Sequence, residues 1–152
     1  MKRFVFSLVT LALVVVALDS WAGPVEEVAQ ISGPRGKLFE EGTAEAYAAV
    51  FADNAVLTSS LSAYRIEGKE AIRAYFAELF QLYPGRRLFV RQPAARAYGD
   101  DLVVQNSYTA LYLSDQSGKV TQFALRSSVV WAKIGGRWLV VDQHVSRLPM
   151  MH

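Results

Sequence analysis

The sequence predicts an α+β fold in which N-terminal helices pack on one face of a curved antiparallel sheet. Three observations carry this prediction. Apolar residues recur with helical spacing in the first half of the chain, segments typical of strands and separated by turns fill the second half, and no helical pattern returns after residue 84. Helices that precede a run of antiparallel strands are typical of α+β proteins, in which the helices cover one side of the sheet.

The helical part follows the first 22 residues. The spacing of apolar residues predicts helices near 25–41 and 43–52, and Thr43 is the expected N-cap of the second. A third helix is expected between Gly68 and Pro84, because aromatic and aliphatic residues recur there at steps of three and four.

The rest of the chain is rich in β-branched and aromatic residues. A short strand is expected at 55–58, before a loop over 62–67. A four-stranded antiparallel meander is expected over 87–98, 102–113, 123–133 and 137–147. Pro93 lies inside the first of these four strands, which suits an edge strand or a bulge. Gly135-Gly136 predicts a tight turn between the last two.

The N-terminus has the pattern of a secretory signal peptide, residues 1–22. Lys2 and Arg3 precede the uncharged apolar run 4–18, and cleavage is expected after Ala22. The alternative is an uncleaved anchor, but the run is shorter than the roughly 20 residues that span a bilayer. We therefore expect a periplasmic or secreted protein, a single domain over 23–152, with no stable membrane insertion after cleavage.

Charge and composition exclude several functions. Cleavage would leave 14 basic and 13 acidic residues. The mature chain would then lack the excess of positive charge that is typical of nucleic-acid-binding proteins. The chain has no cysteine, which excludes disulfides and thiolate nucleophiles. Phosphate-binding loops, nucleotide-binding motifs and nucleophile elbows are absent from the sequence. With one histidine away from the terminus and scattered acidic residues, the sequence offers no set of metal ligands. We expect no cofactor and no metal.

Three stretches resemble known families. The phrases at 51–57 and 68–76, with the order of elements, are similar to the nuclear transport factor 2-like superfamily, which includes SnoaL-like cyclases, ketosteroid isomerase and scytalone dehydratase. The run 138–149 resembles the end of the association domain of calcium/calmodulin-dependent protein kinase II and its bacterial relatives, with Asp142 in place of the first histidine of a histidine-rich stretch. The resemblance implies a cone-shaped fold that hosts isomerases, dehydratases, cyclases, carriers and oligomerisation modules.

A row of polar residues ends the last strand. Alternation along the strand predicts that Asp142, His144 and Ser146 share the face of Trp138 and Val140. Buried polar groups destabilise a fold unless they are paired, so this row is either a satisfied network or one wall of a binding site. His144 is the candidate general base, and Asp142 is the candidate carboxylate that orients it or acts in its place.

Arg126 is expected across the hairpin from His144 or Ser146, on the same face as Ser128. An inward arginine needs an anionic partner, either Asp142 or a bound carboxylate. Relatives of the association domain carry arginines in a deep pocket, and the resemblance therefore implies a ligand role for Arg126.

Tyrosines supply further candidates. A phenol in an apolar cavity can donate to a developing enolate oxygen, as the superfamily resemblance implies, while ordinary amphipathic packing is the alternative. The expected ligand-binding residues are Arg126, Ser128, His144, Ser146, Tyr108 and Tyr75.

Three functions remain open from sequence. We favour an exported small-molecule-binding protein that takes a polar or carboxylated ligand. The alternatives are an isomerase, dehydratase or cyclase that uses His144 or Asp142, and an oligomerisation module. A homodimer through the outer sheet face is also expected, since Leu125, Val129 and Trp131 are predicted to point outward and to need cover.

Overall fold

The structure, a computed structural model, describes residues 22–149. The helices are α1 (Pro24–Glu41), α2 (Ala44–Ala48) and α3 (Lys69–Leu82), and the strands are β1 (Phe51–Thr58), β2 (Ile66–Glu67), β3 (Gly85–Ala97), β4 (Leu102–Ser114), β5 (Val120–Ile134) and β6 (Arg137–Arg147). The strands form one sheet in the order β2-β1-β6-β5-β4-β3, in which β1 runs parallel to β6 and the other neighbours are antiparallel.

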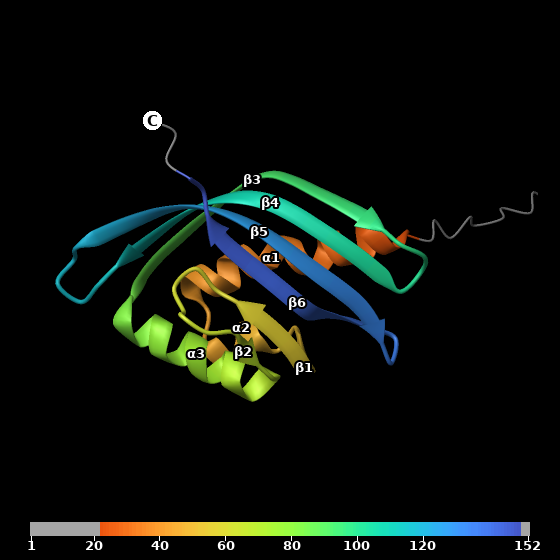
Figure 1. Cartoon of the computed structure of the whole chain (residues 1–152), viewed down its shortest axis with the longest axis horizontal. Coiled ribbons are helices and arrows are strands. Elements are labelled where there is room, and N and C mark those ends of the chain that lie inside the picture. Colours follow the sequence, from red (N-terminus) through yellow and green to blue (C-terminus); the bar gives the residue numbers. More distant parts are fainter. Residues whose placement is uncertain (1–21, 150–152) are drawn as a thin grey trace, which may run out of the picture.

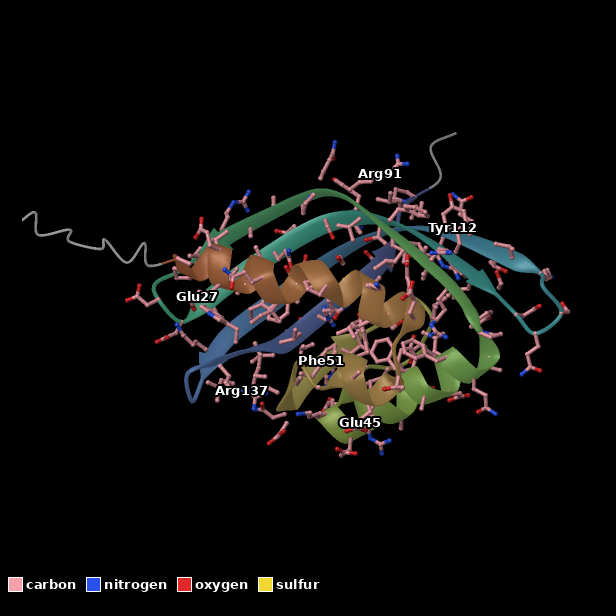
Figure 2. All side chains as sticks on the ribbon, turned by 180° about the vertical axis from the view of Figure 1, so that it is seen from behind. Glu27, Glu45, Phe51, Arg91, Tyr112 and Arg137 are labelled. Carbon is pink, nitrogen blue, oxygen red and sulfur yellow. The ribbon has the colours of Figure 1, made fainter. Side chains whose placement is uncertain are left out.

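The long strands β3 to β6 arch over the helices (Figure 1). The helix α1 lies across one face of this arch, while α2 and α3 lie with β1 and β2 at one end (Figures 1 and 2). We call the side that faces the helices the inner face and the opposite side the outer face. The predicted α+β fold is confirmed, including the antiparallel meander that follows the helices.

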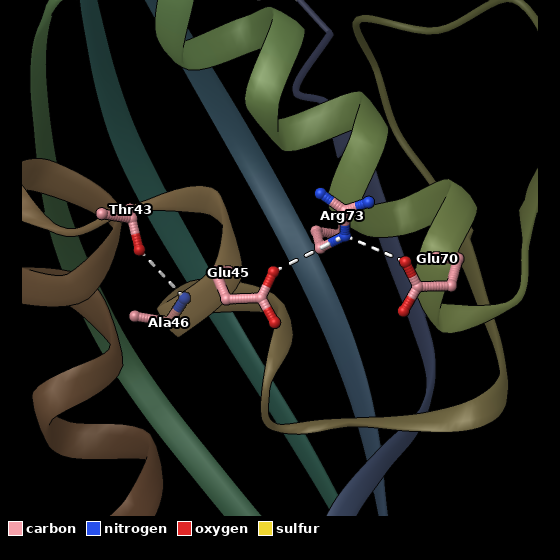
Figure 3. Close-up of polar contacts among 5 residues, drawn as sticks. All are labelled: Thr43, Glu45, Ala46, Glu70 and Arg73. Carbon is pink, nitrogen blue, oxygen red and sulfur yellow. Dashed lines mark hydrogen bonds and ion pairs between the residues drawn. The ribbon is translucent and has the colours of Figure 1, made fainter.

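Thr43 begins α2 as expected, because its hydroxyl accepts a hydrogen bond of 3.2 Å from the amide of Ala46 (Figure 3). Arg73 then ties α2 to α3, since its Nε lies 3.6 Å from a carboxylate oxygen of Glu45 and 2.9 Å from one of Glu70. The expected helix over 43–52 is too long: α2 ends at Ala48.

The helix α2 is short because β1 begins at Phe51 and pairs there with β6. The strand pairs Phe51 with Val140 and Leu57 with Gln143. The expected strand at 55–58 is therefore only the second half of β1. The expected loop over 62–67 also ends in β2, which pairs with β1. Both differences arise from pairing between distant segments, which local patterns do not reveal.

The turn chemistry of the meander follows the sequence. The register of β3 against β4 shifts between Arg91 and Ala94, so Pro93 lies in a bulge, and Gln92 has a φ of 46°. Gly135 and Gly136 both have positive φ, as a tight hairpin turn with the right-handed strand twist requires.

The core lies between the inner face and the helices. Aromatic rings from α1, α2, β1 and α3 meet there: Phe39, Tyr47 and Phe76 contact one another edge to face, and Phe51 packs against Tyr47 and Phe76 at a tilt. Each buried side chain of this size contributes about 1.5–3 kcal/mol to folding. This cluster fixes α1 and α3 against the sheet.

One arginine closes the end of this core. Arg86 Nε donates to the carbonyl of Phe39 at 2.7 Å, and its Nη1 donates to the carbonyl of Tyr83 at 3.1 Å. The guanidinium also lies 3.9 Å from the ring centre of Phe80. Burial lowers the pKa of Arg86. The backbone carbonyls at the ends of α1 and α3 accept its hydrogen bonds and stabilise its charge.

Within the described residues, no helix is long and apolar enough to cross a membrane. The expected signal peptide, residues 1–22, lies outside the described residues except for Ala22.

Candidate functional site

An inner cavity of about 160 Å³ lies between the helices and the inner face of the sheet. Much of its lining is apolar, with side chains such as Leu57, Phe76 and Leu111. Polar side chains also line it, among them Ser32, Arg35, Gln105, Ser107, Ser127 and Gln143. This combination of apolar walls and a few converging polar groups is typical of small-molecule sites.

Arg35 is the charged group of this cavity. It lies on α1 on the same buried stripe as Val28 and Phe39, and its side chain is only 8% exposed. Its Nη2 donates a hydrogen bond of 2.6 Å to Oε1 of Gln143. Its Cζ lies 4.8 Å from the ring centre of Tyr47, and the rings of Phe51 and Trp131 lie at 4.9 and 5.8 Å.

The charge of Arg35 is not neutralised within the described chain. Between residues 22 and 149, no carboxylate oxygen lies within 4.0 Å of its guanidinium, and its buried Nε has no hydrogen-bond partner. The ring of Trp131 lies near the guanidinium, and its indole N–H is also buried without a hydrogen-bond partner. Buried charges in folded proteins are normally paired. Arg35 therefore differs from Arg86, whose donors end on carbonyls.

Gln143 reaches the cavity because β6 contains a bulge. The pairing of β6 with β5 shifts between Trp131, which pairs with Val140, and Val130, which pairs with Asp142. The extra residue, Val141, reverses the alternation beyond it, so Gln143 points inward and is only 9% exposed. The amide oxygen of Gln143 can then accept from Arg35.

Tyr75 supplies a second donor to the inner cavity. Its hydroxyl lies 2.7 Å from the hydroxyl of Ser59, and both residues line the cavity. Burial raises the pKa of Tyr75, an effect that the hydrogen bond with Ser59 partly opposes. The phenol therefore keeps its proton at neutral pH and can donate it to a hydrogen-bond acceptor. Of the expected site residues, Tyr75 is the one that lies in this cavity.

The other expected ligand-binding residues lie on the outer face. Tyr108, Arg126, Ser128, His144 and Ser146 line a hollow of about 450 Å³ on the side of the sheet away from the helices. We call this the outer hollow. The expected pairing of Arg126 with Ser146 across the hairpin is confirmed, and Arg126 Nε donates to the serine hydroxyl at 3.1 Å.

The predicted facing of the β6 row is wrong. Trp138 and Val140 are buried on the inner face, whereas Asp142 and His144 are exposed on the outer face. The bulge at Val141 is the reason, because one extra residue moves every later side chain to the opposite face. The candidate catalytic residues therefore point away from the inner cavity.

Two related expectations are also corrected. Leu125, Val129 and Trp131 were expected to point outward, but all three are buried against the helices, since the inner face of β5 carries its odd-numbered residues. Arg126 consequently points outward, and its side chain bonds to Ser146. A dimer through the outer face would have to use other residues.

Sequence reasoning missed Arg35 and Gln143. Arg35 could have been found, because Val28, Arg35 and Phe39 are spaced by seven and four residues and so predict one buried helix stripe with an arginine in it. Gln143 gave no such signal, because its orientation depends on the bulge. In the described part of the chain, no cluster of three or more His, Cys, Asp or Glu residues could hold a metal ion.

Comparison with known proteins agrees with this architecture. The family model described as the calcium/calmodulin dependent protein kinase II association domain matches residues 26–149. A search of curated proteins found no match. The resemblance seen in the sequence is confirmed.

Several solved structures share the fold. A protein from Xanthomonas campestris, provisionally described as a calcium/calmodulin dependent protein kinase II association domain, is 24% identical, with a TM-score of 0.74 over 86% of this chain and 94% of that chain. A protein from Streptomyces avermitilis, provisionally described as a dehydratase from the nuclear transport factor 2-like family, is 13% identical, with a TM-score of 0.74 over 84% and 98%. A nuclear transport factor 2-like protein of unknown function from Pseudomonas putida is 21% identical, with a TM-score of 0.71 over 82% and 87%.

Proposed function

The chain belongs to the calcium/calmodulin dependent protein kinase II association domain family, and we propose that its inner cavity binds a small molecule with an anionic group. The observation that carries this proposal is Arg35, a buried guanidinium whose Nε has no partner. A carboxylate or similar anion would accept from that Nε and neutralise the charge. Such charge-assisted hydrogen bonds are about twice as strong as neutral ones.

The rest of the cavity defines the ligand further. The apolar side chains of the lining suit a hydrocarbon or aromatic body, and Tyr75 offers a donor to a second oxygen. At about 160 Å³ the cavity is smaller than the roughly 300–1,000 Å³ typical of sites for drug-sized ligands. The proposed ligand is therefore a small molecule with one anionic end and an apolar body.

An isomerase, dehydratase or cyclase is the alternative function, and the fold has neighbours described as enzymes. Proton abstraction needs a base within hydrogen-bond reach of the substrate. Asp142 and His144 lie on the outer face, and no described residue that lines the inner cavity is an aspartate, glutamate or histidine. This arrangement favours binding over proton abstraction in the inner cavity.

Isothermal titration calorimetry tests the proposal with benzoate and its neutral analogue benzyl alcohol as probes. We expect the chain to bind benzoate more tightly. Arg35→Met should weaken benzoate binding about tenfold or more, because a hydrogen bond to a charged group contributes about 1.5–3 kcal/mol. Lys37→Met is the matched control, since it removes a cation that is exposed on the same helix.

The control should bind benzoate as the unmodified chain does. Equal affinities for benzoate and benzyl alcohol would reject an anion site in the inner cavity. Benzoate binding that survives Arg35→Met unchanged would place the bound anion elsewhere on the molecule.

Self-association is a second function that the family suggests. The outer face offers a surface for it, because Phe89 is 54% exposed there. The rings of Phe89 and Tyr112 contact each other edge to face, with centres 5.9 Å apart. We propose a homodimer through this face, and sedimentation velocity of the purified chain tests it.

Export is the third part of the proposal. The basic start, apolar run and small residues of the first 22 residues support cleavage after Ala22. The protein would then act in the periplasm or outside the cell. N-terminal sequencing of the protein recovered from the periplasm of a bacterial host should begin at Gly23, and a start at Met1 would reject cleavage.

A further inference from the structure

The outer hollow is built from two parallel rows of polar side chains. Strand register aligns Tyr108, Arg126 and Ser146 in one row across β4, β5 and β6. It aligns Asn106, Ser128 and His144 in the next row. Each of these six side chains carries at least one hydrogen-bond donor.

Side-chain size and the β3 bulge give the hollow its depth. Ser128, Ser146 and Ala94 are short and leave room beside the longer Tyr108 and Arg126, which are cross-strand partners. Beyond Arg91 the bulge around Pro93 brings Gln92 to the rim of the hollow, with its backbone held at a φ of 46°. Non-glycine residues adopt this conformation infrequently, and such residues cluster at binding sites.

The hydrogen bonds inside the hollow orient its donors. Arg126 Nε donates to the hydroxyl of Ser146 at 3.1 Å, and Asn106 Nδ2 donates to the hydroxyl of Ser128 at 2.7 Å. Both serine oxygens act as acceptors in these bonds, so each serine still has its own proton to donate. The Nη groups of Arg126 also remain available.

The charge of the outer hollow is positive. Arg126 lines it, and Arg91 is the cross-strand partner of Tyr108 at its edge. No described residue that lines the hollow is acidic. Asp142 lies on the same face of β6, but it pairs with Val130 in the row that follows the Ser128–His144 row, and it does not line the hollow.

We propose that the outer hollow is an oxyanion-binding site, which takes a phosphate or carboxylate group between Arg126 and the hydroxyls of Ser128 and Ser146. Donors from three strands surround this position, and the guanidinium provides the charge. The site lies on the opposite side of the sheet from the inner cavity, and Ser107 and Ser127 of β4 and β5 border both. Tyr108 and His144 border the anion and set the size of the group that fits.

Nuclear magnetic resonance of the His144 imidazole provides a local readout. The chain contains two histidines, and the signal that disappears in His144→Gln identifies His144. Inorganic phosphate and acetate are titrated separately at constant ionic strength with chloride. We expect the His144 signal to shift and saturate with at least one of the two anions, and the preferred anion identifies the oxyanion chemistry of the site.

Two variants complete the test. Arg126→Gln should weaken the binding of the preferred anion about tenfold or more. Arg96→Gln should leave it unchanged, because Arg96 is exposed on β3 and does not line the hollow. A His144 signal that does not respond to either anion, or that responds equally in Arg126→Gln, would overturn the site. Benzoate binding through Arg35 would be unaffected by that result.

Discussion

Arg35 is a buried guanidinium that no described carboxylate neutralises and whose Nε has no hydrogen-bond partner in the described residues. Moving an ammonium- or guanidinium-sized charge out of water destabilises a protein by several kcal/mol unless it is compensated. Three aromatic faces contribute about 0.5–2 kcal/mol each, and Gln143 accepts one hydrogen bond. Arg86 shows the structural alternative, since backbone carbonyls accept its donors.

Gln143→Glu should convert the site into a neutral pair. The new carboxylate would lie where the amide oxygen now accepts from Arg35 at 2.6 Å. We expect the free energy of unfolding to change by about 1 kcal/mol or less, because Coulomb attraction and desolvation nearly cancel for buried pairs. Benzoate affinity should fall about tenfold or more, because the glutamate occupies Arg35 and repels the anion.

Calorimetry with benzoate measures this effect. Gln122→Glu adds the same charge at an exposed position of β5 and serves as the control. Unchanged benzoate affinity in Gln143→Glu would mean that benzoate does not contact Arg35.

At the scale of elements, the bulge in β6 decides which residues face the inner cavity. Thr43, Pro93 and Gly135-Gly136 could be interpreted from sequence, because caps, bulges at proline and glycine turns depend on local backbone chemistry. Val141 carries no such mark. The register of β6 shifts against both β1 and β5 at this point, so only tertiary pairing reveals the bulge.

Single-cysteine labelling tests the bulge without interference, because the chain has no cysteine of its own. We expect His144→Cys and Asp142→Cys to react quickly with a bulky disulfide reagent at high dilution. Gln143→Cys should react at least about tenfold more slowly, since buried groups become accessible only through local opening. Fast labelling at 143 with slow labelling at 144 would support a regular strand instead.

The start of α1 is attached to the sheet by Glu27. Its Oε2 accepts from Nε1 of Trp138 at 2.5 Å and from Nζ of Lys133 at 2.8 Å. The hydrogen bond from Lys133, followed by that from Trp138, lowers the pKa of Glu27. Because the folded-state pKa is lowered, the stabilisation is present above the unfolded-state pKa and is lost as the pH falls through the folded-state value.

Urea denaturation at a series of pH values measures this contribution. The unmodified chain should lose stability as the pH falls from neutrality into the acid range, and Glu27→Gln should show a smaller loss over the same range. Glu26→Gln, one residue earlier and exposed, is the control and should keep the original pH dependence. Identical pH dependence in Glu27→Gln and the unmodified chain would contradict the assigned role of Glu27.

At the scale of the whole molecule, the two faces of the sheet differ in their residues. The inner face forms the core and the cavity, as the fold class predicted from sequence implies. The outer face carries the outer hollow with aromatic residues beside it, and Figure 2 shows Arg91 and Tyr112 on this side of the arch. Contiguous exposed apolar groups of this kind mark interaction surfaces.

Phe89→Glu should therefore weaken self-association, because it places a charge in the proposed interface. Sedimentation velocity at micromolar concentration should show a dimer for the unmodified chain and a shift toward monomer for Phe89→Glu. Leu82→Glu is the control, since Leu82 is exposed on α3, away from the outer face. A monomeric unmodified chain would reject the homodimer.

The most direct test of the central claim observes the Nε–H group of Arg35 by nuclear magnetic resonance. Its signal is identified by its absence in Arg35→Met. Since this Nε has no partner in the structure, a bound carboxylate should give it a new hydrogen bond. Saturating benzoate is predicted to move the signal downfield, and benzyl alcohol is predicted to leave it in place. An Nε–H signal that stays unmoved while benzoate saturates the protein would contradict the proposed anion site in the inner cavity.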